Sequence, residues 1–168
     1  MRITRHPLLS GGAALRNIPL DEGVIQRLER SFRLIDAVAP AVVRSFQQRL
    51  ERTQRALGDR FGGDAARLDE HGRALIDSLR LVVTNLRRFD TVKGHLHELG
   101  RRYAPTDLRS MDCAAAIREL VGAMSDTLGP AFTSDQEQEW VRALELMAAM
   151  VREGAGQTVS GFATLSQR

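Results

Sequence analysis

Apolar residues recur every three or four positions over residues 65–88, and this repeat constrains the fold more than any other feature of the sequence. Its members are Leu68, Leu75, Leu79, Val82, Val83 and Leu86. A period near 3.6 is that of an α-helix with one buried face, and no segment alternates at the period of two typical of a half-buried strand. We therefore predict an all-α fold.

Five other segments show helical patterns. Asp21 can cap the first, which Pro40 ends, and a second helix from about Pro40 to Leu57 is broken by Gly58 and the following glycines. Three further helices are predicted over residues 91–102, 108–128 and 133–153. About six main helices thus form one domain over residues 21–155, between a flexible N-terminal arm (1–20) and a loose C-terminal tail (156–168).

Composition excludes several classes of function. The net charge of +3 is spread without a basic run interleaved with aromatic residues, which argues against nucleic-acid binding. No apolar run approaches the ~18 residues of a membrane span, and no signal-peptide core is evident. The single cysteine, Cys113, cannot form an intramolecular disulfide, so we expect a cytoplasmic protein that does not bind membranes.

Several motifs lie in one register along the chain. The segment "RSFQQRLERTQRALGDRF" ends at Phe61, His71 and Leu75 follow on the long helix, and "LGRRY" ends at Tyr103. "AFTSDQEQEW" then leads into the last helix. In this register the chain resembles bacterial globins, in particular the haem domain of flavohaemoglobins and their single-domain relatives, over about residues 24–152 and without a gap between Phe61 and Tyr103.

The resemblance implies a globin-like fold that binds haem b and a diatomic gas such as oxygen. It places Phe61 against the haem, His71 at the distal position and Leu75 over the haem, with Phe46 beside Gln47, which stands where the family has a distal tyrosine. It also implies a gas-binding or sensing protein without a reductase module, so that any turnover would need an external reductase. We expect a binding protein rather than an enzyme.

The proximal side departs from the family pattern. Tyr103 replaces the histidine that ligates iron, and Cys113 and about Ala155, with Glu153 nearby, stand where the family has residues that support this ligand. Since such supporting hydrogen bonds tune an axial ligand, these changes indicate an altered site.

Tyr103 is open to several interpretations. Its phenolate could ligate ferric haem, as tyrosine does in catalase. Iron could instead be held by His71, or by His95 or His97 on the short helix. Alternatively the chain binds no haem and serves as a sensor or protein-interaction module, with Tyr103 a core aromatic residue.

The histidines differ in their expected positions. His95 and His97 lie two residues apart and therefore point about 200° apart on a helix, so we expect each to be a solvated surface residue. His71 precedes Leu75 by one helical turn and is the best placed ligand. Cys113 and the methionines Met124, Met147 and Met150 are expected to be core residues.

Overall fold

All regular structure in the described part of the chain is helical. The computed structural model describes residues 20–61, 63–102 and 113–163, and no strand occurs within these ranges. The elements are α1 (Glu22–Ala37), α2 (Ala39–Thr53), α3 (Arg55–Phe61), α4 (Ala65–Thr84), α5 (Phe89–Arg102), α7 (Cys113–Leu128), the short 3₁₀ helix η2 (Gly129–Ala131) and α8 (Ser134–Ala163). The predicted all-α fold is confirmed.

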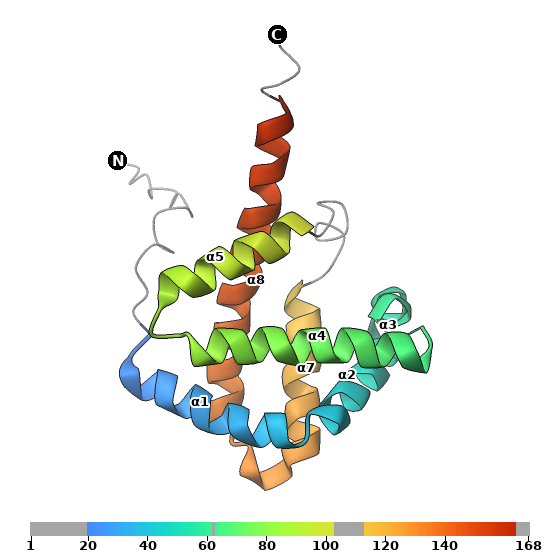
Figure 1. The fold of residues 1–168 in the computed structure, drawn as a ribbon. Helices are drawn as coiled ribbons and strands as arrows, with labels where there is room; N and C mark the ends of the chain where they lie inside the picture. Colours follow the sequence, from blue (N-terminus) through green and yellow to red (C-terminus); the bar gives the residue numbers. More distant parts are fainter. Residues whose placement is uncertain (1–19, 62, 103–112, 164–168) are drawn as a thin grey trace, which may run out of the picture.

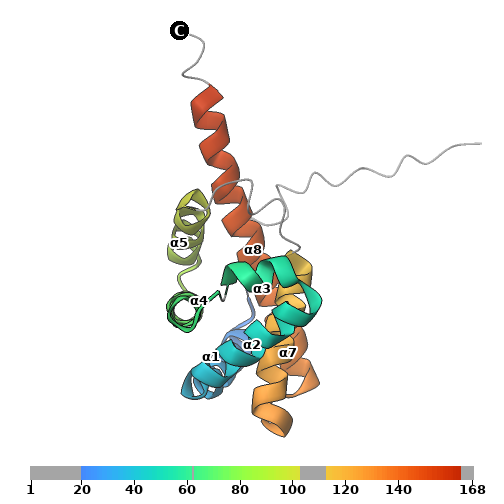
Figure 2. The ribbon, with the colours of Figure 1, turned by 90° about the vertical axis from the view of Figure 1, so that its right-hand side faces the viewer.

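The helices form two layers. α7 and α8 make an antiparallel hairpin around η2, and α1, α4 and α5 cross one side of this hairpin (Figures 1 and 2). α2 packs against α7, α5 packs mainly against α8, and α1 contacts both α4 and α8. None of the described helices is long and apolar enough to cross a bilayer.

The core joins α1 to α8 through Trp140. Its indole is 1% exposed, and Nε1 donates a hydrogen bond to Ser31 Oγ at 2.9 Å. Ser31 Oγ donates in turn to the backbone of its own helix, where the Arg27 carbonyl oxygen lies at 2.8 Å and that of Leu28 at 3.1 Å. The Phe32 ring lies 6.3 Å from the indole, centroid to centroid. A large aromatic side chain is thus buried with its polar atom satisfied.

Two helix boundaries in the first half of the chain differ from the prediction. The helix predicted to run to Leu57 instead ends at Thr53, and α3 starts after a break at Gln54. Gly58 lies inside α3 and does not break it. A Cβ at this position would come 2.9 Å from the Glu51 nitrogen, so the α2 backbone leaves no room for a side chain. This glycine is needed for the close return of α3 onto α2.

α4 and α5 also have shifted ends. α4 ends at Thr84 and not at about Arg88, because Asn85 caps it, with Nδ2 donating to the Leu81 carbonyl oxygen at 2.8 Å. α5 begins at Phe89, two residues before the predicted start.

The last helix is longer than predicted. α8 continues to Ala163, past the expected end at about Glu153 and into the segment predicted as a loose tail, and its final turns extend beyond the other helices (Figure 1). The predicted start of α7 at Leu108 and the predicted arm, except for Leu20, lie outside the described residues.

α5 rests on α8 with backbone against backbone. A Cβ at Gly100 would collide with the Val151 carbonyl oxygen, and one at Gly154 would collide with the His97 carbonyl oxygen. Both positions therefore require glycine for close approach, and this contact holds α5 in place.

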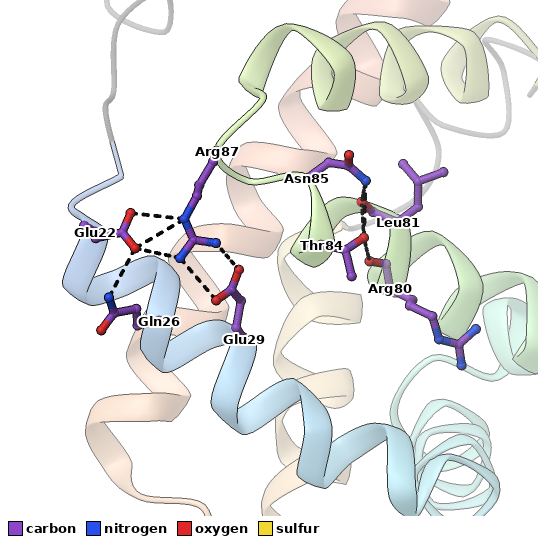
Figure 3. Close-up of polar contacts among 8 residues, drawn as sticks. All are labelled: Glu22, Gln26, Glu29, Arg80, Leu81, Thr84, Asn85 and Arg87. Carbon is purple, nitrogen blue, oxygen red and sulfur yellow. Dashed lines mark hydrogen bonds and ion pairs between the residues drawn. The ribbon is translucent and has the colours of Figure 1, made fainter.

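Arg87, in the link between α4 and α5, ties this link to α1 (Figure 3). Its guanidinium donates to Glu22, with Nη2 2.6 Å from Oε1, and also pairs with Glu29. The hydrogen bond from Arg87, helped by one from Gln26, lowers the pKa of Glu22 below its ordinary value of 4.5. α5 is thus held at two places: Arg87 ties the link before it to α1, and the glycine contact near its end holds it against α8.

Two glycines of α5 provide a matched test of the α5–α8 contact. Gly100→Ala should lower the free energy of unfolding by about 1–3 kcal/mol, because the added methyl group overpacks against a backbone that cannot yield. Gly94→Ala should raise it by about 1 kcal/mol, because that site is open and alanine favours helix. Urea unfolding of both variants checks this, and equal effects would contradict the contact.

Arg87→Met should reduce thermal stability at neutral pH more than at acidic pH. The pKa of Glu22 is lower in the folded than in the unfolded chain, so its stabilising effect is present above about pH 4.5 and is lost as the pH falls through the folded pKa. Melting temperatures of wild type and variant should therefore converge below that pH. Arg88→Met, at an exposed neighbour, serves as the control, and a pH-independent difference would contradict the prediction.

Candidate functional site

The contact between α2 and α4 sets the rotation of α4 about its axis. A Cβ at Gly72 would lie 2.5 Å from Val43 Cγ1 of α2, so Gly72 faces α2 at close range. Since each residue of a helix is turned about 100° from the next, the position of Gly72 determines where His71 points. His71 therefore lies to one side of the α2 contact.

That side of α4 carries a half-buried stripe. Leu68, His71, Leu75 and Ser78 are all partly buried, and Val82 continues the same side into the core. Val82 meets Val92 and Leu96 of α5 around one small cavity, so this side of α4 faces α5. The opposite side carries the exposed residues Asp69, Arg73, Asp77 and Arg80.

α4 and α5 are packed together only near their link. There the cavity has a volume of about 20 Å³ and is lined by apolar side chains of α1, α4, α5 and α8, whereas a site for an organic ligand usually measures about 300–1,000 Å³. Beyond it the two helices diverge (Figure 1), and among the described residues they make few contacts with each other. His71 and Leu75 lie in the half of α4 that is farther from the link.

The expectation that both α5 histidines are solvated is wrong. The His97 side chain is 12% exposed, lies against α8 and has Nε2 3.3 Å from Glu153 Oε2. His95 is half-buried, and its Nε2 atom is buried without a hydrogen-bond partner. The difference arises because α8 covers one flank of α5, so the two imidazoles enter different surroundings.

Two candidate residues lie on α2. Phe46 and Gln47 are both buried, as a role inside the domain requires. Gln47 Nε2 donates to the Gly58 carbonyl oxygen at 2.9 Å and to Glu51 Oε1 at 2.7 Å, while its Oε1 is buried without a partner. Gln47 thus links α2 to α3.

The side chains of two other candidates lie outside the described part of the chain. Tyr103 lies outside the described residues, as does the side chain of Phe61, whose backbone ends α3. The predicted proximal ligand therefore stays a prediction. Across residues 20–61, 63–102 and 113–156, no group of three His, Cys, Asp or Glu side chains is arranged to hold a metal ion.

The residues that stand for the family's proximal supports take part in packing. Cys113 is buried with a free thiol, and Ala155 is buried next to Gly100. Met124 and Met150 are buried, and Met147 packs partly buried against the same core. The expectation that Cys113 and these methionines are core residues is confirmed.

No protein-family model matches the chain, and no curated protein matches it either.

Sequence reasoning missed two features of the site. Gly72 directly follows His71, and the apolar period already places it on the inward face, so its role as a close contact was predictable from the pattern. The burial of His95 was not, since it depends on how α5 lies across helices distant in sequence.

His95→Leu should raise the free energy of unfolding of the ligand-free protein by about 1 kcal/mol at pH 8, because it removes a buried nitrogen that has no partner. His97→Leu, which gives up the contact with Glu153, should be neutral or slightly destabilising. Thermal melts of the two variants side by side check this, and a clear loss of stability in His95→Leu alone would contradict it.

Proposed function

We propose that this chain is a globin-fold protein of the bacterial flavohaemoglobin type, which binds haem b and uses it to bind or sense a diatomic gas. The order and pairing of the helices support this fold, because α1, α2, α4, α5, α7 and α8 pack pairwise in crossing layers, as globin helices do around their haem pocket. The proposal rests also on the sequence register that leads to Tyr103.

The stripe on α4 is the observation that carries the proposal. His71 and Leu75 face the α5 side of α4 at the end where the two helices diverge. An imidazole among partly buried apolar side chains fits a haem, whose iron takes histidine as an axial ligand and whose ring needs an apolar crevice.

The iron ligand is a second part of the proposal. Bound haem would supply the iron centre that holds the gas. A phenolate from Tyr103 would favour the ferric state, whereas ligation by His71 would come from the opposite side of the ring. His97 is a poorer candidate, because it lies against α8 and contacts Glu153.

A haem-free sensor or protein-interaction module is the competing function. Two observations favour it: the apolar cavity between α4 and α5 measures only about 20 Å³, and Cys113 and Ala155 serve in packing. In that case the chain keeps the globin fold but has lost the haem-binding site.

Hemin titration distinguishes the two functions. Wild-type protein mixed with hemin should develop a Soret band at a stoichiometry of about one. If the phenolate is the ligand, Tyr103→Phe should lose the charge-transfer band of ferric high-spin haem while His71→Ala keeps it; the reverse pattern would indicate ligation by His71. His97→Ala, a matched change against α8, should leave the spectrum unchanged.

Absence of a Soret band in the wild-type protein, both as purified and after addition of hemin, would rule out the haem function and leave the haem-free module.

A further inference from the structure

The outer face of α8 carries a regular stripe of mostly polar side chains. Its members recur at alternating spacings of three and four residues, which keeps them on one side of the helix: Asp135, Gln138, Arg142, Glu145, Ala149 and Arg152. All are exposed except Ala149, which is half-buried. Trp140, Leu144 and Met147 lie on the opposite side of α8 and pack in the core, so the stripe faces away from the rest of the domain.

No other described helix covers this face of α8. α1, α4 and α5 cross the α7–α8 hairpin on its other side (Figure 2). On the flanks of α8, charged side chains have partners inside the domain. Glu139 pairs with Arg27 of α1 at 2.6 Å, and Glu137 accepts a hydrogen bond from Ser125 of α7 at 2.6 Å. The four charged residues of the stripe, in contrast, make no ion pair with any described residue.

A groove with a volume of about 480 Å³ lies beside the stripe, between α7 and α8. Its charged lining residues are two arginines and two glutamates, Arg118, Arg142, Glu137 and Glu145. A strongly acidic partner such as a nucleic acid would meet as many like charges as opposite ones there, and so would a strongly basic partner. The groove therefore fits a partner that itself carries both signs.

We propose that this face binds a second copy of the chain, with the two α8 helices antiparallel. Along the stripe the charges read negative, neutral, positive, negative, neutral, positive, and reversing this order exchanges every sign. About a twofold axis at the middle of the stripe, Asp135 meets Arg152 of the second copy, and Arg142 meets Glu145 of the second copy. Each pair forms twice, and the neutral positions face each other. A parallel pairing would instead place like charges opposite one another.

The dimer is expected to be weak. The stripe is only about 27 Å long at the rise of an α-helix, and it is polar, whereas stable interfaces usually bury about 1,200–2,000 Å² in total. Ion pairs at an exposed surface contribute little and are screened by salt. Association should therefore depend on concentration and decrease as the ionic strength rises.

Sedimentation velocity of the whole chain, from micromolar to millimolar concentration and at low and high salt, tests the proposal. Arg142→Glu and Glu145→Arg should each weaken self-association about five- to thirtyfold, because each places like charges opposite one another twice. The double variant, which exchanges the two charges, should recover the wild-type affinity. An equimolar mixture of the two single variants should also associate, since opposite charges then meet between the two chains.

Arg73→Glu, the same change of charge on the exposed side of α4, is the control and should leave association unchanged. A wild-type protein that stays monomeric at millimolar concentration would overturn the proposal, as would a dimer that the single variants do not weaken. A loss of association that neither the double variant nor the mixture recovers would also overturn it. These measurements need no hemin, so their outcome is independent of the haem function.

Discussion

The approach of α4 to α2 at Gly72 is the contact on which the site depends. Because Val43 occupies the space that a Cβ would need, α4 can lie against α2 in one rotation only. That rotation puts the exposed acidic and basic residues of α4 on the solvent side and the stripe from Leu68 to Val82 toward α5. A bulkier residue beside His71 would therefore change what the histidine faces, even though it touches no ligand.

The helices themselves were predictable, because a buried helical face repeats in the sequence whatever it packs against. The stripe of the first helix is an example: Leu28, Phe32 and Ile35 are buried as their spacing indicates. Boundaries at glycine were not predictable. Local rules treat Gly58 and Gly154 as helix breakers, yet both lie inside helices, because neighbouring backbones approach them closely. Tertiary contact overrides propensity at these positions.

The sequence predicts on which helix face each candidate residue lies, but not which atoms its side chain contacts. Placing Phe46, Gln47, His71 and Leu75 on inward or half-buried positions required only helical spacing and the family resemblance. The direction of the Gln47 amide depends on the Gly58 carbonyl, and the contrast between His95 and His97 depends on α8. Gly58 lies on the next helix, 11 residues from Gln47, and Glu153 lies 56 residues from His97, so the spacing within one helix could not indicate either partner. Tyr103 stays a prediction.

The backbone contact between α5 and α8 has a consequence for how the sequence can vary. When two side chains collide, a smaller residue on the partner helix can restore the fit. At Gly100 and Gly154 the opposing atoms belong to main-chain carbonyl groups, which are the same for every amino acid. No substitution at a second position can make room there. If either glycine is replaced, the clash can be relieved only by a movement of α5, which would also move the site that α5 borders.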